Sequence, residues 1–180
     1  MEKQRLYFWA VIPDLNSLAI FQKLKMEWAE RYQSFRSLNS PPHITILPPR
    51  HYTYDQIQYL KSSISLQVDQ LKEFDLLFKS FGRFQKRVIY LKPAPNAKLL
   101  ELYEASKKPF EVLFGSVKHP LFSPHLTLVF KDLSEEQFNR AWARWSETSV
   151  DYGCKVDGVY LLEYFKGSWR EVEKNTFSGP

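Results

Sequence analysis

The sequence predicts an α+β protein built from two copies of one unit, with two mostly antiparallel sheets facing each other and helices outside. Short runs rich in β-branched and aromatic residues alternate with longer segments whose apolar residues recur every three or four positions. The pattern Pro-His-apolar-Thr-apolar occurs twice, beginning at Pro42 and at Pro124. The two histidines, at positions 43 and 125, lie 82 residues apart, close to half of the chain. Such spacing favours a duplicated unit with one motif in each half.

The first half is predicted to run strand, helix, strand, helix. Residues 5–12 are rich in aromatic and β-branched side chains, and Pro13 ends this run. The next segment repeats apolar residues at helical spacing, with Asp14 or Asn16 as its N-terminal cap. We therefore expect a strand at 5–12, a helix at 15–34, a loop at 37–42, a strand at 43–47 that ends at Pro48-Pro49, and a helix that opens at Thr53 or Asp55 and ends near residue 65.

The second half is predicted to begin and end with a pair of strands, and between these pairs it runs helix, strand, helix. Glycine and charged residues at 82–86 indicate a turn between two apolar runs. Pro93 and Pro95 interrupt the chain before the next helical pattern, and Ser134 with two glutamates after it begins another. We expect strands at 74–84 and 87–92, a helix at 96–107, a strand at 125–130, a helix from 134, and closing strands at 155–165 and 169–177.

The composition indicates a folded protein. Hydrophobic residues make up 44% of the chain and aromatic residues 16%, which argues against intrinsic disorder. A single cysteine, Cys154, excludes an intramolecular disulfide framework and a cysteine-cluster metal site. The apolar run at 6–12 is too short for a membrane span and lacks a signal-like cleavage region. We expect one bilobal domain over residues 1–180, monomeric, cytoplasmic and without membrane attachment.

The charge favours an anionic partner without identifying one. The formal net charge is +5 and the pI about 9.2, so the summed field attracts phosphate groups such as those of nucleotides or RNA. A basic protein with no nucleic-acid role accounts for the same charge equally well. Evidence for function must therefore come from the motifs.

The two motifs carry the residues that phosphodiester chemistry needs. Side chains two apart on a strand share a face, so His43 lies beside Thr45, and His125 beside Thr127. If the halves pack as a pseudo-symmetric pair, two imidazoles and two hydroxyls converge on one cleft. A neutral imidazole can take a proton from the attacking oxygen while an imidazolium gives one to the leaving oxygen. The threonine hydroxyls can donate hydrogen bonds to the non-bridging oxygens.

Other kinds of site fit the sequence less well. No acidic residue adjoins either motif and no His-x-His is present, which disfavours a metal centre. His51 and His119 lack a threonine or carboxylate at a matching offset and are expected in surface loops. Cys154 lies in an alternating run without a nearby histidine and is expected in the core. With 6 glycines, the chain also contains no P-loop and no Gly-rich dinucleotide fingerprint.

Two His-x-Thr motifs about 80 residues apart, each opening a strand, resemble the 2H phosphoesterase superfamily. Within it, the chain is similar to the bacterial 2′-5′ RNA ligase-like (LigT-like) proteins. The similarity spans nearly the whole chain and includes an aromatic-glycine turn, SFGRF at 80–84, and an apolar strand, RVIYL at 87–91. Two positions differ from many LigT-like members. Phe130 stands where they carry a basic residue, and Pro48-Pro49 replaces an aromatic-Leu-Gly ending.

The resemblance implies a bilobal, duplicated 2H phosphoesterase fold whose two sheets line a central cleft. It implies that His43 and His125 are catalytic and that Thr45 and Thr127 hold the phosphate. It also implies a metal-independent reaction, without a cofactor, on 2′,3′-cyclic phosphates or 2′-5′ phosphodiesters of RNA ends or small nucleotides. The alternative is a nucleotide- or RNA-binding module of the same fold with little or no turnover. Intact histidines and hydroxyls in both motifs count against that alternative.

Substrate contacts outside the motifs are predicted from residue type. Tyr164 and Trp169 flank the last turn of the chain, and an exposed ring there can stack a base. Arg83 and Lys131, together with Lys86 and Arg87, are candidates for a basic rim. Ordinary core packing of the rings and solvated charges are the competing interpretations.

Overall fold

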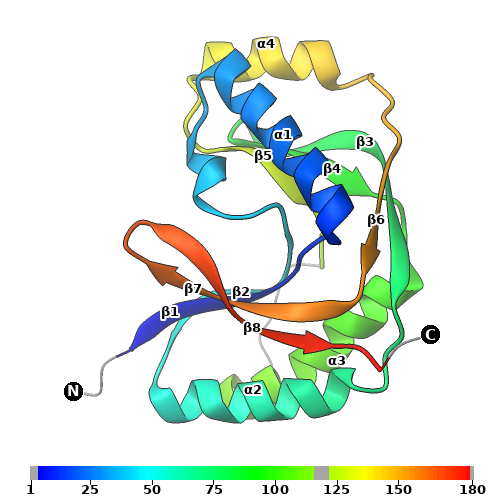
Figure 1. Ribbon diagram of the computed structural model, residues 1–180. Coiled ribbons are helices and arrows are strands. Elements are labelled where there is room, and N and C mark those ends of the chain that lie inside the picture. Colours follow the sequence, from blue (N-terminus) through cyan, green and yellow to red (C-terminus); the bar gives the residue numbers. More distant parts are fainter. Residues whose placement is uncertain (1–3, 116–121, 179–180) are drawn as a thin grey trace.

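The computed structural model describes residues 4–115 and 122–178 (Figure 1). Within these residues the chain forms four α-helices, a short 3-10 helix and one eight-stranded sheet in which all neighbouring strands are antiparallel. The elements are β1 (Arg5–Val11), α1 (Leu15–Tyr32), η1 (Arg36–Asn39), β2 (Ile44–Tyr52), α2 (Tyr54–Val68), β3 (Phe74–Phe84), β4 (Val88–Pro93), α3 (Ala97–Phe114), β5 (Leu126–Phe130), α4 (Glu135–Trp145), β6 (Tyr152–Val156), β7 (Gly158–Phe165) and β8 (Ser168–Thr176).

The sheet consists of two halves of four strands. Its order is β6-β3-β4-β5-β2-β1-β7-β8, and the central pair, β5 and β2, is joined through one residue pair, Ile44 with Leu126. Helices α1 and α4 lie over the half that contains β3, β4 and β5, while α2 and α3 lie over the other half (Figure 1). The predicted α+β class is thus confirmed. The two expected sheets are the halves of one curled sheet, because β2 and β5 still pair where the halves meet.

A constant offset of 82 residues relates β1-α1-β2 to β4-α3-β5. Asp14 and Asn96 stand at equivalent positions and both cap the helix that follows. Each of these two helices packs against the motif strand of the other copy: α1 contacts β5, and α3 contacts β2. Each histidine motif is therefore supported by the helix of the other copy. The structure extends the predicted repeat beyond the motif to the whole strand-helix-strand unit.

Local polar groups define where the helices begin. The Asp14 carboxylate accepts hydrogen bonds from the backbone N–H groups of Asn16 and Ser17, which identifies Asp14 as the cap of α1. Both α2 and α4 begin with a capping box, formed by Thr53 with a glutamine three residues later and by Ser134 in the same way. These caps satisfy backbone donors that the first helical turn leaves free.

The prediction that the first motif strand ends at Pro48-Pro49 is wrong. Strand β2 continues through both prolines to Tyr52. Beyond Ile44 the strand no longer pairs with β5. Along that edge no neighbouring strand requires a backbone N–H donor, so the missing N–H of proline is tolerated. On the other side, the pairing with β1 shifts register between Tyr7 and Trp9, opposite the prolines. A bulge of this kind accommodates residues that cannot donate a hydrogen bond.

Two further boundaries differ from prediction. Helix α3 extends to Phe114 through Pro109 and does not end at residue 107. Phe110, which is 2% exposed, anchors this extension in the core and offsets the hydrogen bond that proline removes. The predicted strand 155–165 is two strands that meet at Asp157. Strand β6 pairs with β3 and β7 with β1, so this segment crosses from one half of the sheet to the other.

The core has a large and a small part on opposite faces of β1. Trp9 and Val11 point into the large cluster, together with most buried residues of the helices. Phe8, Ala10 and Ile12 point the other way and form a smaller cluster. This alternation places an aromatic floor on the face of the sheet where the motif residues lie. In the described part of the chain, no helix is long and apolar enough to cross a membrane.

Candidate active site

The two motif histidines are held in the same way in the two halves of the molecule. His43 Nδ1 lies 2.7 Å from the carbonyl oxygen of Pro41, and His125 Nδ1 lies 2.7 Å from that of Ser123. In each case the accepting carbonyl belongs to the residue two positions earlier. A neutral imidazole bound in this way donates from Nδ1, so Nε2 is the ring nitrogen left to exchange a proton.

The register of the central strands brings the two motifs together. Ile44 pairs with Leu126 in antiparallel strands, so extending the register by one residue sets His43 across from Thr127 and His125 across from Thr45. Both apolar partners are buried, with 2% and 0% exposure, while the four motif residues are partly exposed on the other face. All four line a single cleft of about 390 Å³. The structure therefore places all four predicted residues in one site.

Aromatic rings support each imidazole from behind. His43 packs against Phe8, with ring centroids 4.9 Å apart, and His125 packs against Phe84 and Tyr90 at 4.7 and 5.2 Å. Phe8 and Tyr90 are equivalent under the 82-residue offset. Gly82 makes room for Tyr90, since a Cβ at this glycine would overlap the tyrosine ring. The rings limit the rotation of both imidazoles.

Burial keeps both imidazoles neutral in the ligand-free protein. Loss of solvation lowers the pKa of His43 to about 4, opposed by the Pro41 carbonyl and reinforced by the positive charge of Lys25 and, once it is protonated, by that of His125. Loss of solvation also lowers the pKa of His125, opposed by the Ser123 carbonyl. Both groups are thus uncharged near pH 7. An anionic ligand in the cleft would favour the protonated form of either ring.

Of the predicted substrate contacts, the two rings lie at the cleft and the two cations do not. Tyr164 and Trp169 both line the cleft, 5.2 Å apart, at the hairpin formed by β7 and β8. Trp169 also packs edge-on against Phe8 at 4.5 Å. Arg83 lies over the ring of Trp142 on α4, and the Lys131 ammonium lies over Phe130, and neither cation is among the residues that line the cleft. Arg83 lies on β3, while Lys131 directly follows β5 in a left-handed conformation, and each side chain packs on a neighbouring ring.

The 3-10 helix η1 and the residue that follows it contribute cleft residues that the sequence pattern did not identify. Arg36, Ser37, Asn39 and Ser40 all line the cleft. The Ser37 hydroxyl is buried and has no hydrogen-bond partner among the described residues. Asp132 holds η1 in place by accepting from the backbone N–H of Arg36 at 2.8 Å and from the hydroxyl of Ser34. The only sequence signal was a polar loop directly before the first motif.

The remaining histidines and the cysteine lie elsewhere. His51 is exposed, as expected, but it belongs to β2 and not to a loop. His119 lies outside the described residues. Cys154 is buried, which confirms its place in the core, and burial raises the pKa of its thiol to about 12. In residues 4–115 and 122–178, no group of three or more His, Cys, Asp or Glu side chains is arranged to hold a metal ion.

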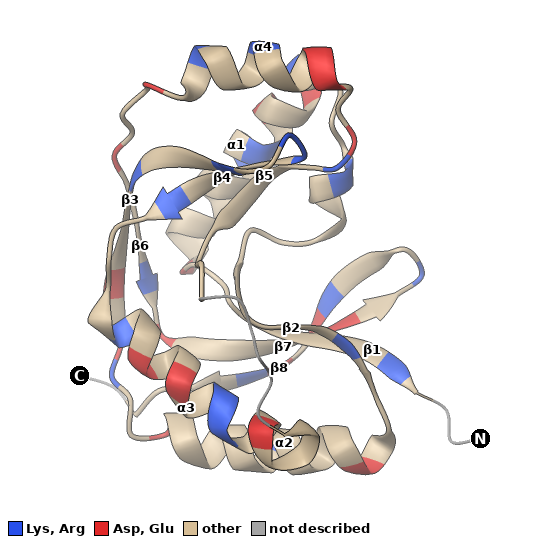
Figure 2. Cartoon of the chain, turned by 180° about the vertical axis from the view of Figure 1, so that it is seen from behind, with Lys and Arg blue, Asp and Glu red and all other residues tan. Residues whose placement is uncertain are grey.

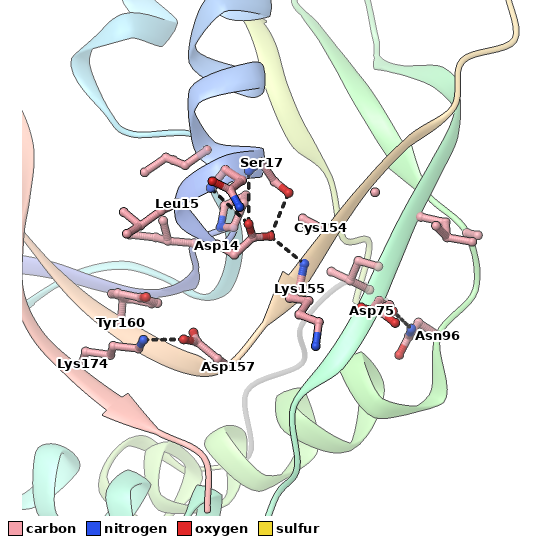
Figure 3. Close-up of a pocket in the computed structure, with 18 of the residues that line it drawn as sticks. Asp14, Leu15, Ser17, Asp75, Asn96, Cys154, Lys155, Asp157, Tyr160 and Lys174 are labelled. Carbon is pink, nitrogen blue, oxygen red and sulfur yellow. Dashed lines mark hydrogen bonds and ion pairs between the residues drawn. The ribbon is translucent and has the colours of Figure 1, made fainter. Parts of the chain in front are cut away.

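A larger hollow, of about 1010 Å³, lies at the start of α1, away from the histidines (Figure 3). Its polar groups largely bind one another: Lys174 pairs with Asp157 at 2.6 Å, and the Asp14 carboxylate accepts from the backbone N–H of Lys155 at 2.9 Å. Four acidic residues and two lysines line it, which disfavours a phosphate ligand there. Elsewhere Lys, Arg, Asp and Glu mix on α3 and α4 (Figure 2), so charge alone does not mark the histidine cleft.

Solved structures share this fold along almost the whole chain. Escherichia coli LigT without a ligand superposes with a TM-score of 0.68 at 16% identity and covers 98% of this chain and 99% of its own. The protein TT0787 of Thermus thermophilus gives a TM-score of 0.68 at 16% identity, covering 97% and 98%. A LigT structure contains 3′-AMP, with a TM-score of 0.67 at 16% identity, covering 98% and 99%. At these identities the likeness concerns the fold.

Sequence comparison leads to the same family. A candidate phosphoesterase of Bacillus licheniformis is 25% identical over 155 residues, which make up 84% of this chain and 89% of that protein. The model of the 2′-5′ RNA ligase superfamily matches residues 13–167, which include both motifs. The chain therefore belongs to the 2′-5′ RNA ligase superfamily, and the predicted resemblance to the 2H phosphoesterases is confirmed.

Proposed function

We propose that the protein is a metal-independent phosphoesterase that acts on 2′,3′-cyclic phosphates or 2′-5′ phosphodiesters of RNA ends or small nucleotides. The observation that carries the proposal is the paired arrangement of His43 and His125. Both donate from Nδ1 to a backbone carbonyl, and both line one cleft with Thr45 and Thr127. Acid–base cleavage requires two groups that can exchange a proton, one on either side of the phosphate, and the two Nε2 atoms can fill these roles.

In the proposed reaction, one histidine is neutral and the other protonated. The neutral Nε2 accepts a proton from the attacking water as its oxygen bonds to phosphorus. The protonated Nε2 donates its proton to the oxygen that leaves as its bond to phosphorus breaks. The hydroxyls of Thr45 and Thr127 donate to the non-bridging oxygens, where negative charge accumulates. The number of protons on the pair is unchanged overall, and the two histidines exchange roles when the reaction runs in the ligating direction.

Substrate binding allows the site to take up from solvent the proton that the free site lacks. Burial lowers the pKa of both histidines, so at neutral pH the empty cleft contains two neutral rings. A phosphodiester anion between them raises the pKa of each, and the first proton taken up prevents the second by repulsion. The singly protonated pair is the reactive state. The Ser37 hydroxyl and Arg36 at the same cleft are further donors for the phosphate.

The nature of the substrate is proposed from the rings and from relatives. Tyr164 and Trp169 offer aromatic surface at the cleft, and a base stacked on such a ring gains roughly 1–3 kcal/mol. E. coli LigT has been crystallised with 3′-AMP, with phosphate and with ATP. A nucleotide with its phosphate at the histidines and its base at the rings suits the cleft. Because one chain supplies all of these groups, we propose a single bilobal domain that acts as a monomer. The location that we propose for it is the cytoplasm, where nucleotides and RNA ends are available as substrates.

The test is a substrate panel in excess chelator. The purified protein is incubated with 2′,3′-cyclic nucleotides and with 2′-5′ and 3′-5′ dinucleotides, and the products are separated by chromatography. We expect turnover of a cyclic phosphate or a 2′-5′ linkage that is lost in a His43→Ala/His125→Ala double variant. Activity that appears only after a divalent ion is added would assign a different mechanism. Tight nucleotide binding without turnover of any panel member would favour the binding-module alternative.

A further inference from the structure

A second hollow, of about 460 Å³, adjoins the histidine cleft. The two share three lining residues, Asn39, Ser40 and Trp169, so the Trp169 ring stands at their boundary. The second hollow continues from there between α1 and the loop that leads to His43. Its other walls include the exposed Met26 and Leu38, which are 54% and 40% exposed. Apolar surface thus extends away from the histidines on one side.

Among the described residues, Lys25 is the only charged one that lines this second hollow. It is 3% exposed, and its Nζ donates to the carbonyl oxygen of Ser40 at 2.8 Å. None of the ion pairs found in residues 4–115 and 122–178 involves Lys25. Burial lowers the pKa of Lys25 to about 8, so the ammonium is still mostly protonated at neutral pH. A buried cation usually has an anionic partner.

The second copy of the repeat shows what such a lysine does when carboxylates are present. The 82-residue offset makes Lys107 on α3 equivalent to Lys25. Lys107 pairs with Glu104 at 3.3 Å and with Glu111 at 3.8 Å. The equivalent positions on α1 hold Gln22 and Ala29, which carry no charge. The second copy neutralises its lysine with two glutamates, whereas Lys25 in the first copy lines a hollow and has no carboxylate at those positions.

We propose that the second hollow is a subsite for the neighbouring nucleotide of the substrate, with Lys25 binding the phosphate next to the one being cleaved. The apolar wall formed by Met26 and Leu38 receives the sugar or base of that nucleotide, and Trp169 separates it from the nucleoside in the cleft. This inference rests on the proposed function. It assigns the protein to RNA ends or oligonucleotides of at least two nucleotides, in preference to cyclic mononucleotides.

Binding of products tests the subsite without requiring turnover. Adenosine 3′-monophosphate and the dinucleotide ApA carrying a 3′-phosphate differ by one nucleotide, which is one nucleoside and one phosphate. Calorimetric titration of the wild type should give a dissociation constant about tenfold lower for the dinucleotide, since one more charge-assisted contact forms. Equal affinity for the two ligands would overturn the proposal, whether or not the protein turns over any substrate.

A matched pair of helix variants locates the effect. Met26 and Ile20 are exposed to the same extent on α1, at 54% and 53%, but only Met26 lines the second hollow. Met26→Glu places a negative charge beside the proposed phosphate and should abolish the preference for the dinucleotide while leaving 3′-AMP affinity unchanged. Ile20→Glu should change neither. The subsite would be contradicted if Met26→Glu weakened the binding of 3′-AMP and of the dinucleotide equally. It would also be contradicted if Ile20→Glu reduced the dinucleotide preference as much as Met26→Glu does.

Lys25→Met tests the ammonium itself. Methionine keeps most of the buried volume and removes the charge, so the dinucleotide preference should fall about tenfold. Because Lys25 also holds the Ser40 carbonyl and its charge acts on His43, the affinity for 3′-AMP is measured with the same variant, and the preference is taken as the ratio of the two dissociation constants. If turnover is absent in the panel but this preference is present and depends on Lys25, the proposed reaction fails and the subsite stands. A Lys25→Met protein that retains the full preference would refute the role of Lys25.

Discussion

The neutral state of His43 makes a prediction about stability that needs no substrate. Its native pKa of about 4 lies below the ordinary value of 6.5, which applies to the unfolded chain. Between these two values the unfolded chain binds a proton that the native protein does not bind. The free energy of unfolding therefore falls as the pH falls from about 6.5 to about 4, and this contribution changes no further below that range. Replacement by a residue that does not titrate, His43→Asn, should remove this dependence.

The size of the effect follows from the two pKa values. Between pH 7 and pH 5, a native pKa of about 4 against 6.5 corresponds to a loss of about 2 kcal/mol of unfolding free energy. The His43 side chain is partly exposed at the cleft, and solvent screening reduces the expected loss to about 1 kcal/mol. Carboxylates that titrate in this range do so in both proteins and cancel in the comparison. The difference between wild type and His43→Asn isolates this one ring.

The assay is urea unfolding at pH 7 and pH 5, followed by tryptophan fluorescence. We expect the wild type to lose about 1 kcal/mol more than His43→Asn between the two pH values, with equal m-values. His51→Asn is the matched control, because His51 is exposed on the same strand, and it should behave like the wild type. An identical pH dependence of wild type and His43→Asn would refute the conclusion that the folded protein holds this imidazole neutral.

Two further predictions concern turnover. His43→Ala and His125→Ala should each lower kcat by roughly 10²–10⁴-fold on the best panel substrate. The double variant should lower kcat by far less than the product of the two single reductions. A reduction equal to that product would show that the two rings do not act as a pair. Gly82→Ala should displace the Tyr90 ring that packs on His125 and lower kcat by about tenfold with little change in 3′-AMP affinity, and an unchanged kcat would show that Tyr90 does not position the imidazole.

Much of the site follows from spacing that is local in the sequence. The period of two along a strand determines that His43 and Thr45 share a face and that Ile44 faces the core, and the structure has this arrangement in both motifs. Helix caps are equally local, and Asp14 and Ser134 begin their helices as expected. Such features depend on a few neighbouring residues, so the sequence alone determines them. The family resemblance rests on the same local pattern.

Other features depend on contacts between distant segments, and only the tertiary structure decided them. The pairing of Ile44 with Leu126 makes one sheet of the two halves and sets each histidine opposite the other motif's threonine. The cleft wall from Arg36 to Ser40 lies there because Asp132, almost a hundred residues later, binds η1. Arg83, which was predicted to contact substrate, packs over the ring of Trp142 on α4. Strand pairing and side-chain direction depend on the free energy of the whole packed chain. Local spacing in the sequence does not determine that free energy.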